Sequence, residues 1–478
     1  MGSQNTAERE DRKKRTSRSF AMARLFGRRS VVVETRLWAV ALACGILVGL
    51  VMAAMRKAIV AVELFGFGVE DERITTAVIG LHPGRVILIP IIGGIVVSLL
   101  LYLGMKLGIR GDPRMGGIRD VINARRHVLD KRGRTTPLEK MHMTIKDGIQ
   151  TFLIAIVSLG SGASAGREGP AVHIGAVLSG FFAHRLKFTP AQIRALLGCG
   201  AAAAVASSFN APLAGLLFAH EVILGRYRIS DIGPIAVASV SGALVTRLIF
   251  GNNAVFIPPD ISNPPVTFFL GTPFMGLIAA GLAIVMIRAW LHAPDVGRMV
   301  AKAMHVPLYV LPPFAGLLMG MFALAFPQIL GVGYEATASA IAGGYGAAFM
   351  LILAIAKIAA TALCIGTRFG GGVFSSSIFV GAMIGGFFGA LMAFLTGEGE
   401  AAQTFFTVVG MGAISGAVLG APISTTLIVF ELTRSYESAA AVLISVSLAT
   451  VIVQAVEGGS IFQQQSRRVQ HNDKLRTL

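Results

Sequence analysis

Long apolar runs alternate with short polar segments along most of the chain. The clearest runs are Leu37–Met55, Val86–Met105, Val266–Ile287 and Phe349–Ile365, the last of which is interrupted by Lys357. A helix of about 20 apolar residues is long enough to cross the hydrocarbon core of a bilayer. The pattern therefore predicts an all-α protein that crosses a membrane many times.

The composition supports this prediction and adds a detail about the helices. Apolar residues make up 54% of the 478 positions and charged residues only 14%, which leaves too little charge for the surface of a soluble domain. The chain also has 57 glycines and 19 prolines. Within a membrane these residues occur where helices break or pack closely. We expect tilted helices, some of which cross the bilayer only in part.

Positive charge gathers in a few segments. Lysines and arginines cluster between residues 12 and 29, in the segment 119–146 and near the C-terminus, whereas the segments 251–265, 326–337 and 396–404 contain none. This asymmetry matches the positive-inside rule. It predicts a multi-pass protein of the cell membrane, in a bacterium the inner membrane, with both termini in the cytoplasm. The net charge of +17 is thus explained without a nucleic-acid partner.

Two blocks of sequence occur twice in the same order. Residues 200–221 align without a gap on residues 410–431, and residues 166–182 match residues 371–388 so that Glu168 lies opposite Phe374. Chance matching of Gly- and Ala-rich helices is the alternative to duplication. Duplicated halves with interrupted helices are typical of transporters, whose site lies where the halves meet. We expect a basic N-terminal segment (1–36), a first membrane repeat (37–250), an inter-repeat loop (251–264), a second repeat (265–470) and a short tail (471–478).

The segment 159–169 is too rich in small residues to hold a straight helix, and apolar helix resumes after Pro170. Glu168 is therefore predicted at a helix start within the membrane. Such an end carries free N–H groups and a partial positive charge, so it can bind an anion, and a carboxylate there can compete with that anion. The alternatives are that Glu168 only caps its helix or pairs with Arg167. The second half offers a matching turn (366–379), where the amides of Val373 and Phe374 are candidate ligands.

These residues resemble the CLC family of chloride channels and proton-coupled chloride exchangers. The sequence GREGP at 166–170 is similar to that family's signature, with Gly166, Arg167 and Gly169 around Glu168. The resemblance implies two inverted repeats, a homodimer with one anion pathway per subunit, and Glu168 as the gating glutamate. It is the prokaryotic type without CBS domains that we expect, because the chain ends soon after residue 470.

The chain departs from the family's pattern at several positions. The serine of the family's GSGIP turn is replaced by Gly116, its central tyrosine by Phe462, and the last residue of its GxFxP turn by Ser376. Both side-chain donors to the central anion are then missing. The inner glutamate of the exchangers is replaced by Val222, which cannot carry a proton and favours channel-like uniport.

Neighbouring residues have more ordinary interpretations. A packed His220 is favoured over a proton relay, and Glu221 is expected to hold nearby backbone or Arg226. Lys357 could raise anion occupancy by long-range attraction, or it could snorkel or pair with an acid.

The sequence therefore predicts the transport of chloride or a similar small inorganic anion. Proton-coupled exchange, and a preference for another anion such as fluoride, nitrate or bromide, stay open as alternatives. A membrane scaffold or receptor is a further alternative. No metal cluster, cofactor motif or catalytic set is found in the apolar segments, so we expect no enzyme.

Overall fold

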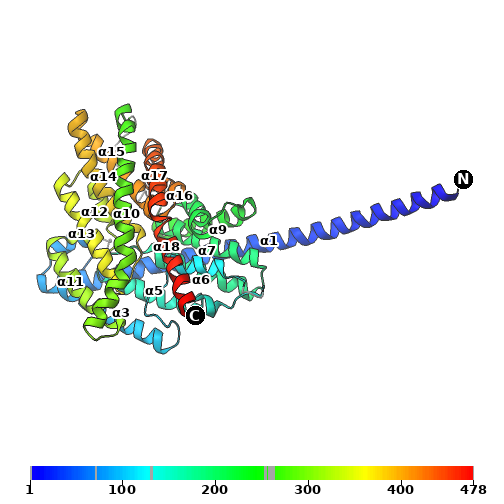
Figure 1. The fold of residues 1–478 in the computed structure, drawn as a ribbon, viewed down its shortest axis with the longest axis horizontal. Helices are drawn as coiled ribbons and strands as arrows, with labels where there is room; N and C mark the ends of the chain where they lie inside the picture. Colours follow the sequence, from blue (N-terminus) through cyan, green and yellow to red (C-terminus); the bar gives the residue numbers. More distant parts are fainter. Residues whose placement is uncertain (1–2, 70–72, 130–132, 252–255, 257–263, 477–478) are drawn as a thin grey trace.

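The computed structural model describes residues 3–69, 73–129, 133–251, 256 and 264–476, with side chains from Thr35 to Arg468. These residues form helices that gather in one bundle, from which the start of α1 projects (Figure 1). The helices of the first half are α1 (Ser3–Phe67), α2 (Ile74–Ile79), α3 (Pro83–Lys106), α4 (Ile118–Arg126), α5 (Ile145–Gly160), α6 (Glu168–Arg185), α7 (Pro190–Phe209), α8 (Pro212–Phe218), its π-helical continuation η2 (Ala219–Leu224), and α9 (Ile229–Phe250).

The second half follows with α10 (Val266–Ala303), α11 (Pro312–Ala325), α12 (Tyr334–Ile341), α13 (Ala347–Gly366), α14 (Phe374–Thr396), α15 (Glu400–Leu419), α16 (Pro422–Thr433), α17 (Tyr436–Glu457) and α18 (Ile461–Arg476). Short 3-10 turns lie at Leu138–Met141, Leu308–Val310 and Pro327–Ile329.

Eleven helices of the described residues are long and apolar enough to cross a membrane. The four apolar runs in the sequence lie within α1, α3, α10 and α13. The predicted multi-pass, all-α architecture is therefore confirmed. The helix α1 runs without a break across residue 36.

The two halves repeat the same series of helices. The series α5 to α9 corresponds in order and length to α13 to α17, and α6 and α14 begin at Glu168 and Phe374, the two positions that the sequence alignment pairs. The third members of the two series, α7 and α15, end in a left-handed residue, Asn210 in one half and Gly420 in the other. Each is followed by an alanine and by a proline that opens the next helix.

Glycine allows the same close helix contact in both halves. A Cβ atom on Gly200 would lie 2.1 Å from the carbonyl oxygen of Gly175, and one on Gly410 would lie 2.4 Å from that of Gly381. Neither distance leaves room for a side chain. Small residues let helix backbones approach closely in membranes. The duplicated glycines thus fix how α6 packs on α7 and α14 on α15.

Two glutamates show that the halves are inverted relative to one another. Glu221, in η2 after α8, accepts hydrogen bonds from the amides of Ile423 and Ser424 at the start of α16, at 3.1 and 2.7 Å. Glu431, near the end of α16, accepts from the first amides of α8 at 3.2 and 2.8 Å. Each helix ends where the other begins, so α8 and α16 run antiparallel. The expectation that Glu221 holds nearby backbone is confirmed.

Candidate anion-binding site

The two glycine turns, which lie some two hundred residues apart in the sequence, pair directly. Gly166 and Gly372 exchange backbone hydrogen bonds of 2.8 and 2.7 Å in an isolated antiparallel bridge. A Cβ atom on Gly169 would lie 3.3 Å from the Cα atom of Gly372, so a side chain here would press on the second turn. The bridge therefore holds the starts of α6 and α14 side by side.

Glu168 is the first residue of α6, and its side chain is fully buried between the halves. Its Oε1 atom accepts a hydrogen bond of 2.5 Å from the Ser375 hydroxyl and one of 3.3 Å from the Tyr334 hydroxyl. Its Oε2 atom is buried with no hydrogen-bond partner among the described residues. A buried carboxylate oxygen without a donor is costly, so the arrangement is suited to a group that can move away.

Arg167 precedes this helix start and is directed elsewhere. Its guanidinium donates to the carbonyl oxygen of Ser208 at 3.2 Å and lies 5.3 Å from the ring centroid of Tyr334. It thereby connects the end of α7 to the residue that contacts Glu168. Arg167 therefore stabilises the position of Tyr334, and within the described residues it forms no ion pair with the Glu168 carboxyl.

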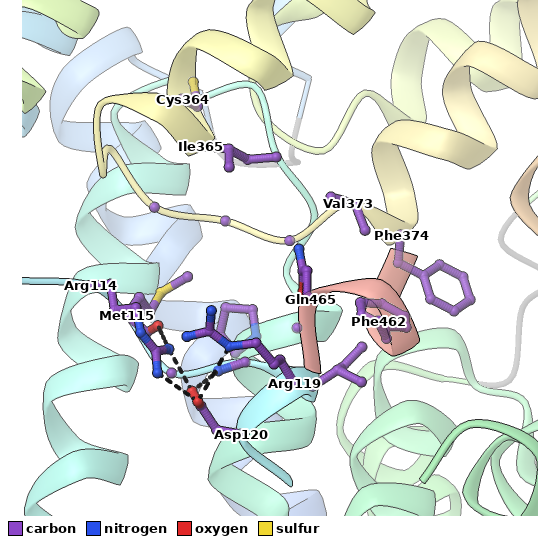
Figure 2. Close-up of a pocket in the computed structure, with 18 of the residues that line it drawn as sticks. Arg114, Met115, Arg119, Asp120, Cys364, Ile365, Val373, Phe374, Phe462 and Gln465 are labelled. Carbon is purple, nitrogen blue, oxygen red and sulfur yellow. Dashed lines mark hydrogen bonds and ion pairs between the residues drawn. The ribbon is translucent and has the colours of Figure 1, made fainter. Parts of the chain in front are cut away.

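A cavity of about 160 Å³ lies beside the paired turns, where the starts of α4, α6, α14 and α18 converge. It brings together five residues singled out from the sequence, which are Gly116, Gly169, Val373, Phe374 and Phe462. Glu168, Gly166 and Arg167 do not line it in this structure. Figure 2 shows Val373, Phe374 and Phe462 on one side of the cavity and Arg114, Arg119 and Asp120 on the other.

Val373 is the N-cap of α14 and Phe374 its first residue. The amides at this position have no acceptor in a preceding helical turn, so they are available to a bound anion. The Phe374 ring is fully buried and packs against Phe209 and Phe218 at centroid distances of 5.0 and 5.9 Å. Packing on this side fixes the backbone that presents the two amides.

The start of α4 differs from the expectation. The amide of Gly116 donates to the Thr151 hydroxyl at 3.1 Å, and that of Gly117 donates to the Asp120 carboxylate at 3.2 Å. Both donors are therefore already engaged within the protein. A Cβ atom on Gly116 would lie 2.4 Å from Nδ1 of His173, so the histidine ring occupies the space of a side chain at this position.

The cavity's acidic residue belongs to a buried ionic network. Asp120 accepts from Arg114 at 2.7 Å and from Arg110 at 3.1 Å, and Arg110 also pairs with Asp147 at 3.0 Å. Burial alone raises the pKa of Asp120, but these two arginines lower it well below its ordinary value. The carboxylate is thus held in its charged form and neutralised by the arginines around it.

The residues considered for proton transfer are packed in ordinary ways. Val222 lies in η2, packs against the apolar core and is not part of the cavity. His220 is fully buried, with Nδ1 3.1 Å from the carbonyl oxygen of Arg226 and its ring stacked on Tyr227. This fits the packed histidine favoured from the sequence.

Lys357 neither snorkels nor pairs with an acid. Its side chain is fully buried in α13, and its ammonium donates to the carbonyl oxygens of Ile329 and Gly331, both at 2.9 Å. It also lies 5.1 Å from the ring centroid of Phe379. Among the residues that the structure describes, no carboxylate comes within 4.0 Å of it. A buried cation without an anionic partner attracts negative charge over a long range.

Sequence reasoning missed both hydroxyl partners of Glu168. Ser375 stands in the glycine-rich turn of the second half, but nothing local to that segment indicates that it faces an acid on another helix. Tyr334 is the first residue of α12, a short helix that the apolar pattern of the sequence does not predict. Only the pairing of the two turns could have indicated Ser375, and no sequence signal indicated Tyr334.

With this geometry established, comparison with known proteins identifies the family. The model of the family described as "Voltage gated chloride channel" matches residues 109–454, which is most of the chain. The chain belongs to the CLC family. CLC membership is consistent with the signature around Glu168 and with the paired halves, and it assigns the chain to chloride transport.

Curated CLC relatives resemble the chain over most of its length. A protein named "Putative chloride channel protein ClcB-like" from Ralstonia nicotianae is 28% identical over 404 residues, which cover 82% of this chain and 87% of that protein. The "Voltage-gated ClC-type chloride channel ClcB" of Escherichia coli O127:H6 is 27% identical over 441 residues, covering 90% and 98% of the two chains.

Solved CLC structures share the fold. A slow cyanobacterial Cl⁻/H⁺ antiporter superposes with a TM-score of 0.77 at 20% identity, covering 91% of this chain and 98% of its own. A CLC-type fluoride/proton antiporter superposes with a TM-score of 0.68 at 18% identity, covering 90% and 98%. The predicted fold, two inverted repeats of helices within a membrane, is therefore confirmed.

Proposed function

We propose that this chain carries chloride or a similar small monovalent anion across the membrane by channel-like uniport, through a pathway gated by Glu168. One observation supports the gate above all. The Glu168 carboxyl is buried at the junction of α6 and α14, held by hydroxyls from the second half, and has one oxygen without a donor.

The gate works by competition between two negative charges. With Glu168 in place, its carboxylate lies at the helix starts whose free amides and partial positive charge favour an anion. When the carboxyl takes up a proton or swings away from Ser375, a dissolved anion can occupy the neighbouring position at the amides of Val373 and Phe374. Gly166 and Gly169 keep the first turn close to the second, and Arg167 supports the site through Ser208 and Tyr334. Phe462 lines the cavity beside Val373 and Phe374.

Uniport is favoured over exchange because no proton carrier replaces the inner glutamate. Val222 is apolar and packed, and His220 is engaged with backbone and Tyr227. The second candidate is proton-coupled exchange, since two proteins of the same fold are described as antiporters.

A reversal-potential measurement separates the two candidates. In proteoliposomes with fixed chloride on both sides, uniport gives a reversal potential that stays unchanged when a proton gradient is imposed. A shift of the reversal potential with the proton gradient would establish exchange. If no anion current or flux appears at all, for chloride, nitrate, bromide or fluoride, the proposed function is wrong.

The assembly and orientation complete the proposal. Family resemblance supports a homodimer with one pathway per subunit, and the segregation of lysine and arginine supports cytoplasmic termini in a bacterial inner membrane. Cross-linking in native membranes tests the dimer. Protease access to a C-terminal tag in spheroplasts tests the orientation, because a cytoplasmic tag stays protected until the membrane is opened.

A further inference from the structure

The cavity at the helix starts has cationic walls as well as backbone donors. Three arginines line it, Arg114 and Arg119 around the start of α4 and Arg368 in the turn before α14. Arg114 is held by Asp120 at 2.7 Å. The other two are held much less closely, since Arg119 comes no nearer than 3.8 Å to Asp120 and Arg368 no nearer than 3.4 Å to Asp112.

Asp120 in the cavity and Asp112 beside it each pair with more than one arginine. Asp120 contacts Arg114 and Arg110 at hydrogen-bonding distance, and Asp112, whose side chain is 52% exposed, lies 3.4 Å from both Arg114 and Arg368. Burial and the neighbouring Arg114 lower the pKa of Arg119 to about 10, so it keeps its charge at neutral pH. Positive charge therefore exceeds negative charge along the wall.

Arg368 occupies a backbone position that glycine would take more easily. Its φ is 66°, in the left-handed region, where a side chain carries a conformational cost. The side chain is nine-tenths buried, and its Nε–H has no hydrogen-bond partner among the described residues. A strained and buried arginine with an unused donor at a cavity wall indicates a ligand.

The usual donors are missing from this end of the cavity. Gly116 and Phe462 bring no hydroxyl, and the amides of Gly116 and Gly117 are taken by Thr151 and Asp120. An anion that lies between α4 and α14 can therefore obtain its hydrogen bonds from guanidinium groups. Planar guanidinium forks match planar oxyanions, to which they donate two parallel hydrogen bonds, better than they match a spherical halide.

We propose that Arg119 and Arg368 form an anion-binding site at the α4 side of the pathway, and that this site recognises a small planar oxyanion of the nitrate class in preference to chloride. The inference rests on the proposed function, because the site supplies the anions that pass Glu168. It assigns the selectivity of the pathway to two side chains that the gate does not use.

The test compares nitrate and chloride uptake by the full chain in proteoliposomes, as the half-saturating concentration of each ion. The variants are Arg119→Gln, Arg368→Gly and the double substitution; glycine suits the left-handed backbone, so folding is preserved. We expect the double variant to need about tenfold more nitrate and only about twofold more chloride. The exposed Arg288, which pairs with Glu457 outside the cavity, serves as the control in Arg288→Gln and should change neither value.

A second double variant tests whether the planar guanidinium groups, and not only their charge, are needed. Arg119→Lys with Arg368→Lys keeps both charges but removes the planar donors, so chloride uptake should stay near wild type while the preference for nitrate is lost. Unchanged nitrate affinity in the glutamine and glycine variants would overturn the proposal, and so would an equal loss for both ions. Wild-type protein that transports neither ion would instead contradict the proposed function, so the two failures are distinguishable.

Discussion

The start of α6 and the start of α14 have a similar backbone arrangement but chemically different side chains. Both follow a glycine-rich turn, both turns share one bridge through Gly166 and Gly372, and both helices open at the junction of the halves. At the first position α6 has Glu168 and α14 has Phe374. The Glu168 carboxyl is held by two hydroxyls and can leave them, whereas the Phe374 ring is locked between two other aromatic rings.

This difference shows how a duplicated element can serve two purposes. The symmetric part, made of backbone and glycines, builds two donor-rich helix ends that lie side by side. The asymmetric part, made of side chains, gives one end a titratable group and the other a fixed apolar support. The glutamates Glu221 and Glu431 belong to the symmetric part. Each accepts hydrogen bonds from the first backbone amides of the other half's helix, α16 for Glu221 and α8 for Glu431.

The largest expected effect is a loss of stability when either of these two glutamates is replaced. Glu221→Gln and Glu431→Gln each replace a charged acceptor of two backbone amides, so each should lower the stability of the folded protein by about 2 kcal/mol. Thermal unfolding of purified protein in detergent, followed by intrinsic fluorescence, measures both. The two losses should agree closely, and a variant that leaves the unfolding temperature unchanged would show that its helix start is not held by this glutamate.

The next largest effect is expected when the carboxylate at the start of α6 is removed. Glu168→Gln removes the carboxylate that competes with the anion, so anion flux should rise about tenfold, equivalent to about 1.4 kcal/mol, and any pH dependence or proton coupling should disappear. Flux from proteoliposomes at two pH values provides the measurement. Phe374→Leu, at the matched position, is the control and should keep the wild-type pH dependence. Wild-type pH dependence in the Glu168 variant would refute the gate.

The smallest effect refines the picture of how the carboxyl is held. Ser375→Ala removes the shorter hydrogen bond to Glu168, which should free the carboxyl and raise flux about threefold, as expected for one hydrogen bond. Tyr334→Phe removes the longer one and should change flux less. Single-anion flux measured at one pH suffices for both. A larger change from Tyr334→Phe than from Ser375→Ala would reverse the assignment of the main partner.

Much of the architecture could be predicted from the sequence because it depends on local chemistry and on repetition. Apolar runs such as Val86–Met105 have no stable alternative to helix within a bilayer, since every backbone polar group must be satisfied internally. The repeated blocks by themselves place Glu168 opposite Phe374. The small residues around Gly166 indicated a broken helix, and the charge of Glu168 within an apolar region indicated a site.

Contacts between distant segments were decided only by the tertiary structure. The two turns approach through the bridge of Gly166 and Gly372, and that approach brings Ser375 and Tyr334 to Glu168. Arg119 and Arg368 line the same cavity although they lie far apart in the sequence. Periodicity and motif spacing report on a helix and its own faces, whereas the partner of a buried polar group depends on which helix packs against it. The packing of the two halves therefore set the hydrogen bonds of the site, while the chain's own pattern determined the helices that carry them.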